Sequence, residues 1–247
     1  MKSVQSPYGE VYVGPKTSLY EVFTKLIKET VANTNYPPGV ALSGGSSPKA
    51  YFKWLADHAD LLPELKQDIV FTVSDERHVP IESEESNYGN ALRLFFEPMG
   101  VEVDNRFPWD TTRAPEDAAD WFGKLWELSF GSDNTYDICM LGMGDDCHTA
   151  SLFPGSPLLK GDLKQGANFA AVNVPGKGDR LTITPRGLSR CGKIVMMVTG
   201  AGKADALHRL FHEGPHAVSD VPVSVLGSFP DKVVWLIDDE AATRLSL

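Results

Sequence analysis

The sequence has few cysteines and no long hydrophobic run. The three cysteines, Cys139, Cys147 and Cys191, are odd in number and no two are spaced as C-x-x-C. Neither a disulfide framework nor a structural zinc site is therefore expected, and a reducing, cytoplasmic location fits best. No stretch of 18 apolar residues occurs, so no transmembrane helix is expected. Residues 1–15 lack the apolar core and the cleavage site of a secretory signal.

A basic surface is also missing. The formal net charge is −10, and Lys and Arg form no run anywhere in the chain. Nucleic acids and anionic membrane surfaces are therefore not expected as partners. A small anion is still compatible with this charge. The net negative charge of the protein repels an anion, so a local group of Arg, Lys and backbone N–H groups would have to bind it.

Apolar segments alternate between strand-like and helix-like patterns. The 247 residues are 42% hydrophobic and show no internal repeat and no linker, which predicts a single domain over residues 1–247. Strands alternating with helices predict an α/β fold: an open, mostly parallel, doubly wound sheet with helices on both faces. The expected strands are 39–42, 68–73, 137–141, 169–174, 181–184, 193–198 and 233–238; the expected helices are 18–32, one following 43–48, one around 92–96, 116–128, 202–211 and a short one at 240–245.

Two details set the expected helix ends. Ser18 and Glu21 have the spacing of a capping box, which predicts that the first helix starts at Ser18. The dipeptide Glu97-Pro98 is expected to stop the apolar helix around residues 92–96, because the residue before a proline disfavours helical geometry.

Polar, glycine-rich stretches follow several of the expected strands directly. In a parallel sheet these positions form the carboxyl edge, where ligands of open α/β folds bind. The stretch SGGSSP, with Ser43, Gly44, Gly45 and Ser46, precedes a helix, so its N–H groups could receive a phosphate or a carboxylate. A plain serine cap and turn explains the same letters equally well.

Two other glycine motifs are incomplete. TGAGKA (199–204) lacks the first glycine of a P-loop and has Ala204 in place of Ser or Thr, which disfavours ATP binding. Lys203 is either a phosphate ligand or a solvated lysine. GMGDDC (142–147) has two of the three glycines of a dinucleotide fingerprint, so it is weak support for such a cofactor.

The stretch SDER (74–77) and the histidine at 148 carry the remaining chemistry. Arg77 could bind an anion or a developing oxyanion, or form an ordinary surface pair with a neighbouring carboxylate. Asp145 and Asp146 precede His148, and a carboxylate partner would suit this imidazole for acid–base work, although a lone loop histidine is more often structural. No second ligand stands at metal-binding spacing, and no G-x-S-x-G nucleophile elbow occurs. Taken together at the strand ends, these groups favour acid–base chemistry on a small phosphorylated molecule.

The same loops resemble the 6-phosphogluconolactonase family. The similar segments are SGGSSPK (43–49), SDERHVP with SNYGNA (74–80 and 86–91) and LGMGDDCHTASLFPG (141–155), with RLTITP (180–185) and VTGAGKADAL (198–207) as looser matches. The family pattern is G-x-G-x-D-G-H, and Cys147 replaces its last glycine. If that position needs a positive φ, cysteine there costs roughly 1–2 kcal/mol.

The resemblance implies the fold of the related deaminases and hydrolysis of 6-phospho-D-glucono-1,5-lactone, with no metal and no cofactor. It implies a catalytic group of His148 as base and then acid, Asp146 orienting it, Arg77 at the oxyanion or the substrate, and Asp75 fixing Arg77 or a sugar hydroxyl. The phosphate would be held by Ser43, Gly44, Gly45, Ser46, Arg180 and Lys203. The expected partner is a phosphorylated sugar lactone, bound by a monomer or weak homodimer. Alternatives are a sugar-phosphate isomerase or deaminase, a non-catalytic sugar-phosphate sensor, and a nucleotide-binding module.

Overall fold

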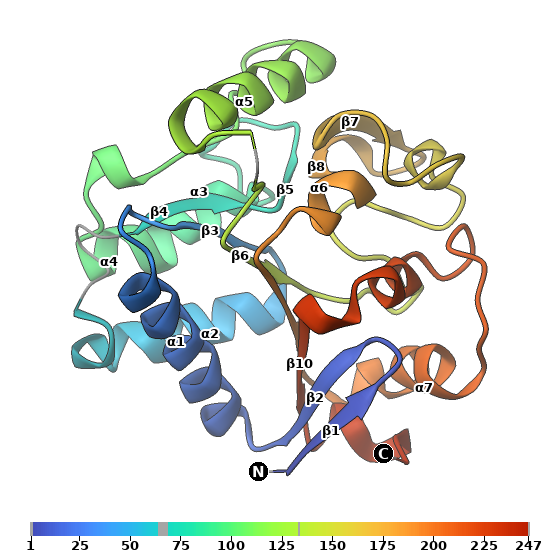
Figure 1. Cartoon of the computed structure of the whole chain (residues 1–247). Helices are drawn as coiled ribbons and strands as arrows, with labels where there is room; N and C mark the ends of the chain where they lie inside the picture. The colour runs from blue at the N-terminus through green and yellow to red at the C-terminus, as the bar shows by residue number, and fades with distance from the viewer. Residues whose placement is uncertain (1, 64–68, 133, 247) are drawn as a thin grey trace.

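A seven-stranded sheet runs through the molecule in the order β1-β2-β10-β9-β6-β3-β4 (Figure 1). The computed structural model describes residues 2–63, 69–132 and 134–246. Every neighbouring pair in this sheet is parallel except β1 and β2, which form an antiparallel hairpin. The strands of the protein are β1 Lys2–Ser6, β2 Gly9–Gly14, β3 Gly39–Leu42, β4 Val70–Val73, β5 Asp75–Arg77, β6 Ile138–Leu141, β7 Phe169–Val174, β8 Gly178–Ile183, β9 Lys193–Val198 and β10 Val233–Asp238.

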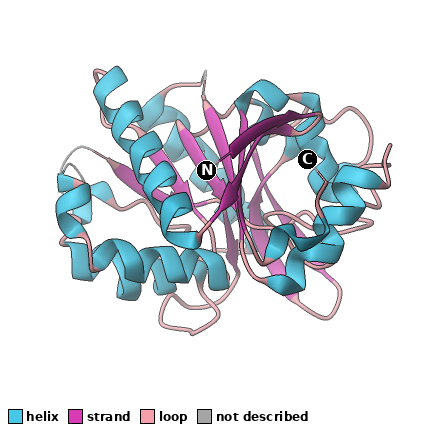
Figure 2. Ribbon diagram, turned by 90° about the horizontal axis from the view of Figure 1, so that it is seen from below, coloured by secondary structure: helices cyan, strands magenta, loops and turns pink. Residues whose placement is uncertain are grey.

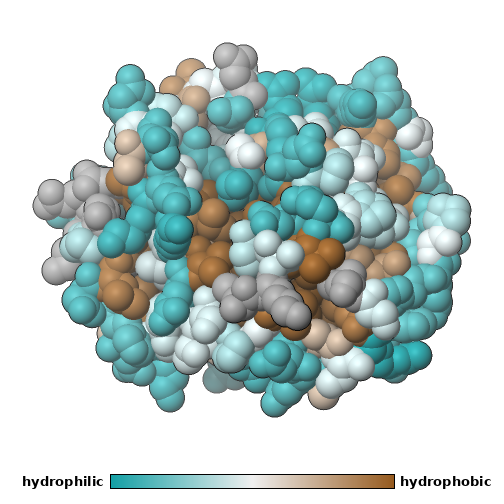
Figure 3. Space-filling view, turned by 60° about the horizontal axis from the view of Figure 1, so that its bottom comes forward, coloured by the Kyte–Doolittle hydropathy of each residue, from teal (hydrophilic) through white to brown (hydrophobic). Residues whose placement is uncertain are grey.

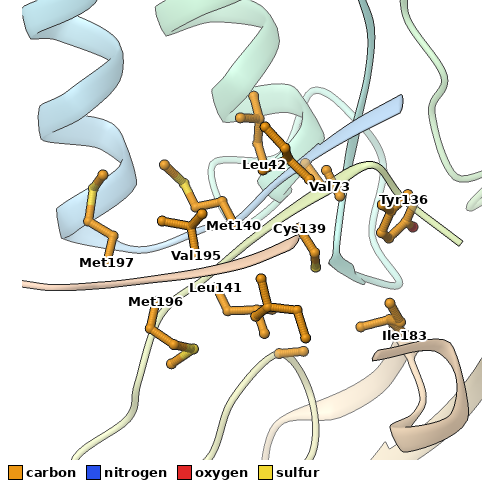
Figure 4. Packing of buried hydrophobic residues seen from close by; sticks show 14 of the residues in the cluster. Leu42, Val73, Tyr136, Cys139, Met140, Leu141, Ile183, Val195, Met196 and Met197 are labelled. Carbon is orange, nitrogen blue, oxygen red and sulfur yellow. The ribbon is translucent and has the colours of Figure 1, made fainter. Parts of the chain in front are cut away.

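The central strands are apolar on both faces, and helices cover both. All residues of β3, β6 and β10 are buried. In β9, Val195 and Met197 lie on one side of the strand and Met196 on the other, so alternate residues pack on opposite faces of the sheet (Figure 4). Figure 2 shows helices on either side of the strands. The predicted open, mostly parallel, doubly wound α/β sheet is confirmed.

The helices agree with the expected segments in most cases. They are α1 Lys16–Asn33, α2 Ser46–Ala56, α3 Asn87–Ala91, α4 Glu97–Met99, α5 Pro115–Phe130, α6 Pro185–Ser189 and α7 Ala204–His212. A π-helix, Leu92–Phe96, joins α3 to α4. Short 3₁₀ turns occupy Ala59–Leu61, Val103–Asn105, Pro157–Leu159, Ala201–Lys203, Pro222–Ser228, Pro230–Lys232 and Ala241–Arg244.

Two expected helix ends were wrong. The helix α1 begins at Lys16 with Pro15 as its N-cap and no side-chain cap, so Ser18 and Glu21 lie inside the helix and form no capping box. The helix near Pro98 continues to Met99, and Gly100 ends it with a φ of 65°. A left-handed glycine therefore stops this helix, rather than the proline.

A second sheet of three antiparallel strands, β5-β8-β7, was not expected. The segments 169–174 and 181–184 were predicted as strands, but within the parallel sheet, and residues 75–77 were expected to form a loop. Figure 1 shows α5 beside β7, and Phe122 of α5 lies edge-on to Phe169 of β7 with ring centroids 4.9 Å apart. The second sheet therefore packs against α5, and its apolar residues join the hydrophobic core of the central sheet.

Ser74 connects the two sheets. It follows β4 and precedes β5, its N–H donates to the carbonyl of Leu42 and its carbonyl accepts from the N–H of Ile183. The chain thus passes from one sheet to the other within one residue. The single domain over residues 1–247 stays a prediction. Asp68, the first residue of an expected strand, lies outside the described residues.

The surface seen in Figure 3 is mainly hydrophilic, with separate hydrophobic areas between the polar side chains. Leu128 and Val103 are the most exposed of the large apolar side chains in the described part of the chain. Scattered exposed residues of this kind are normal for a folded protein. None of the described helices is long and apolar enough to cross a membrane.

Candidate active site

A pocket of about 200 Å³ lies at the carboxyl edge of the central sheet. The strands β9, β6, β3 and β4 are neighbours in the sheet. The walls of the pocket come mainly from the ends of these strands and from the segments that follow them. Eight residues that the sequence had singled out line it: Ser43, Gly44, Gly45, Ser46, Asp75, Arg77, His148 and Lys203. The topology therefore brings four distant stretches of sequence to one cavity.

The SGGSS turn forms one wall and begins α2. Gly45 is the N-cap, with φ 100° and ψ 179°, a conformation that L side chains rarely adopt. A Cβ at Gly44 would lie 1.9 Å from Oδ1 of Asn87, so this position has no room for a side chain. The free N–H groups and the positive dipole end of the 11-residue α2 are available at the same place.

The imidazole of His148 is held by its neighbour Asp146. Nδ1 lies 2.5 Å from Oδ1 of Asp146, and the backbone N–H of His148 donates to the same oxygen at 3.1 Å. The ring stacks on Phe153 with centroids 4.1 Å apart. Partial burial would raise the pKa of Asp146, but the hydrogen bonds from His148 outweigh it and lower the pKa. The carboxylate therefore stays ionised beside the ring and fixes its orientation.

Gly144 makes room for this pair. A Cβ there would lie 1.9 Å from Nδ1 of His148 and 2.6 Å from Oδ1 of Asp146. The turn is closed by the N–H of Gly144, which donates to the carbonyl of His148 at 2.9 Å. Glycine at 144 is therefore required by contact with the histidine, whatever its backbone angles.

Cys147 does occupy a position with positive φ, at 65°. Its side chain is buried, Sγ lies 3.7 Å from the carbonyl oxygen of Ala206, and its own carbonyl accepts from the N–H of Val223. Burial raises the pKa of this thiol, so it stays protonated at neutral pH. The substitution of the family glycine thus introduces backbone strain but no reactive thiolate.

Asp75 and Arg77 point to the same side of β5, as alternate residues of a strand do. Asp75 is buried, and its carboxylate accepts from the hydroxyls of Ser151 at 2.7 Å and Ser74 at 3.3 Å. The guanidinium of Arg77 donates to the carbonyl of Glu85 at 2.6 Å. The contacts of the Asp75 carboxylate are therefore with serines, where the sequence had suggested Arg77 or a sugar hydroxyl.

Glu76, between them, faces the other side and was given no role from the sequence. Its buried carboxylate accepts four hydrogen bonds, from the N–H groups of Arg77, Asn87 and Tyr88 and from the hydroxyl of Ser86, at 2.6–2.9 Å. Burial raises its pKa, and these hydrogen bonds oppose the rise. Glu76 therefore fixes the start of α3 against β5. Successive side chains of a strand point to opposite faces, and this alternation could have distinguished Glu76 from Asp75 and Arg77 in the sequence.

The two remaining basic residues are placed differently. Lys203 lines the pocket, and its Nζ lies 2.6 Å from Oδ1 of Asp145. Arg180 does not line the pocket; it pairs across the strands with Arg77. Burial lowers the pKa of Arg180, and the charge of Arg77 lowers it further. Of these two residues, only Lys203 is therefore in a position to reach a ligand in this cavity directly.

A further link joins the two glycine loops. The hydroxyls of Ser47 and Thr199 are 2.7 Å apart, and both oxygens of the Asp238 carboxylate accept from the N–H of Gly200, at 2.9 and 3.0 Å. The loop that bears Lys203 is thus tied to the SGGSS turn. Within the described part of the chain, no three His, Cys, Asp or Glu side chains are gathered closely enough to hold a metal ion.

The fold and the pocket define an α/β protein whose ligand site lies at the carboxyl edge of a parallel sheet. The family model described as glucosamine-6-phosphate isomerases/6-phosphogluconolactonase matches residues 16–235. The chain belongs to this family, and the resemblance drawn from its motifs is confirmed.

Individual relatives agree. The 6-phosphogluconolactonase of Synechocystis sp. is 31% identical over 227 residues, which are 90% of this chain and 88% of that protein. The solved 6-phosphogluconolactonase of Trypanosoma cruzi has a TM-score of 0.82 at 28% identity, covering 98% of both chains. A monomeric glucosamine-6-phosphate deaminase shares the fold, with a TM-score of 0.79 at 19% identity over 95% of this chain and 99% of that one.

Proposed function

We propose that this protein hydrolyses 6-phospho-D-glucono-1,5-lactone to 6-phospho-D-gluconate in the oxidative pentose phosphate pathway. One observation carries the proposal: the His148 imidazole and the SGGSS turn line the same pocket. Membership of the family and the lactonases among its relatives support the choice of substrate.

In this proposal the phosphate binds at the start of α2. The N–H groups of Gly44, Gly45 and Ser46 and the dipole of the helix favour an anion there, with Ser43 beside them. Lys203 adds the positive charge. Arg180 is paired with Arg77 across the strands and contributes through its field, since it does not line the cavity.

The lactone carbonyl lies toward His148 in this arrangement. With Nδ1–H donated to Asp146, Nε2 is the basic nitrogen and takes a proton from the attacking water. The carbonyl becomes a tetrahedral oxyanion, which Arg77 stabilises. When the bond to the ring oxygen breaks, the same imidazolium returns its proton to that oxygen. Asp75 orients the loop of His148 through Ser151 and faces the sugar hydroxyls.

Two competing functions use the same scaffold. A sugar-phosphate isomerase or deaminase shares the fold, as the solved deaminase does. A non-catalytic sensor needs no acid–base pair, so the close Asp146–His148 contact disfavours it. A monomer or weak homodimer is the proposed active form. The cytoplasm is the proposed location.

The test is a lactonase assay on freshly prepared 6-phosphogluconolactone, with the spontaneous hydrolysis rate subtracted. We expect His148→Ala to lower kcat by about 10²–10⁴. His58→Ala is the matched control, because that ring is exposed and stacks on Trp54 at the end of α2. A near-normal kcat in His148→Ala rejects the assigned role. Ammonia release from glucosamine 6-phosphate without lactone hydrolysis would instead identify a deaminase.

A further inference from the structure

The lysine of the pocket is paired with a carboxylate of the protein itself. Nζ of Lys203 lies 2.6 Å from Oδ1 of Asp145, and the side chains are 25% and 78% exposed. Asp145 belongs to the loop after β6, and Lys203 to the loop after β9. The ion pair therefore joins the loop that carries His148 to the loop that carries the lysine.

The position of Lys203 is fixed from the other end as well. Asp238 holds the N–H of Gly200, and Thr199 is bonded to Ser47 in the SGGSS turn. These hydrogen bonds tie the start of the loop that bears Lys203 to the SGGSS turn and to the end of β10. An anion bound at the turn must therefore share the ammonium group with Asp145 or displace it.

The two neighbouring aspartates have separate partners. Asp146 is bonded to His148, whereas Asp145 is bonded to Lys203. In the family pattern G-x-G-x-D-G-H, Asp146 occupies the fixed Asp and Asp145 the variable position before it. The role of Asp145 can therefore be altered without touching the hydrogen bond that orients the imidazole.

We propose that Asp145 weakens the binding of anions to this pocket by competing for Lys203, and so sets the KM for the substrate and eases release of the product. The identity of the anion as a sugar phosphate rests on the proposed function; the competition itself does not. A phosphoryl group has up to two charges and three acceptor oxygens, so it wins the ammonium from a single carboxylate. Breaking the Asp145–Lys203 ion pair costs little, because the Asp145 side chain is mostly in water.

The experiment measures binding of inorganic phosphate and of 6-phosphogluconate by titration calorimetry at low salt. We expect Asp145→Asn to bind both about two- to fivefold more tightly than the wild type, the range that an exposed pair contributes. Lys203→Met should weaken binding. In the double variant, Asp145→Asn should no longer tighten binding. The difference between the wild type and Asp145→Asn should shrink at high salt, where exposed charges are screened.

Asp231→Asn is the matched control for charge. Asp231 is exposed and precedes β10, so it lies at the edge of the sheet opposite the pocket. The substitution removes the same charge and should leave binding unchanged. Tightening in this control equal to that in Asp145→Asn would overturn the proposal, as would equal tightening with and without Lys203.

The two proposals fail separately. Phosphate binding with the expected response to Asp145→Asn, but no lactone hydrolysis, would reject the proposed function and leave the competition standing. Lactone hydrolysis with phosphate affinity unchanged in Lys203→Met would overturn the competition and leave the lactonase standing.

Discussion

The strained backbone at Cys147 leads to a prediction about the order of two variants. At a position with φ of 65°, a non-glycine residue costs about 1–2 kcal/mol, whereas glycine has no such penalty. Glycine loses about 0.5–1 kcal/mol more backbone entropy on folding than alanine. The difference leaves Cys147→Gly more stable than Cys147→Ala by about 0–1.5 kcal/mol, with a midpoint of about 0.75 kcal/mol.

Both variants lose the buried sulfur atom, so this loss cancels in the comparison. Relative to the wild type, Cys147→Ala should lose about 1 kcal/mol, somewhat more than the ~0.8 kcal/mol of one buried methylene group. Urea unfolding followed by circular dichroism gives both free energies of unfolding. In a chain of this length, 1 kcal/mol corresponds to about 2–4 °C in Tm.

Cys139 offers the matched control, because it is equally buried but lies in β6 with ordinary strand geometry. There the order should reverse, with the glycine variant about 0.5–1 kcal/mol less stable than the alanine variant. The reasoning is refuted if glycine is the less stable choice at 147 by the same margin as at 139.

Three other predictions concern the groups around the pocket. Gly144→Ala should lower kcat by about 10²-fold, because the new Cβ would displace the imidazole of His148. The circular dichroism spectrum should be unchanged. A normal kcat would show that the imidazole does not need the space beside Gly144. Asp238→Asn should raise KM and lower the free energy of unfolding by about 1–3 kcal/mol, since it weakens the hold on the N–H of Gly200, and unchanged KM would separate that loop from binding. The folded pKa of Asp146 is lowered, so its stabilisation is present above the ordinary pKa of about 3.9 and is lost as pH falls through the lowered value. In Asp146→Asn, the free energy of unfolding should lack this loss at acid pH. If the free energies of unfolding of the variant and the wild type depend on pH identically in this range, the reasoning is wrong.

The sequence predicted the parts of the fold that have a strong period. Buried runs such as 193–198 and 233–238 were recognised because a strand covered on both faces is apolar throughout. The place of β5 in the second sheet was missed because β5 has only three residues, all charged, and its pairing partner β8 follows about a hundred residues later. Pairing between strands so far apart in the chain produces no recognisable pattern in the sequence around either strand.

The site was recovered by residue type more than by geometry. The glycine turn, Lys203 and His148 were placed together from strand ends alone, and they do line one pocket. Arg180 was expected at the phosphate and is not in the cavity. Its looser motif indicated its strand but not whether its side chain reaches the cavity. Glu76 was overlooked because a buried carboxylate that accepts only from nearby N–H and O–H groups looks, in sequence, like any other acid.

Arg77 and Arg180 are paired across β5 and β8, and repulsion by the charge of Arg77 helps to lower the pKa of Arg180. An anion in the adjoining pocket adds negative charge beside this pair and so relieves the repulsion. Any ligand that binds only the folded state raises its resistance to unfolding in proportion to the logarithm of ligand concentration. The protein should therefore be hardest to unfold in a cell that is actively making its substrate. It should be degraded fastest when that supply stops.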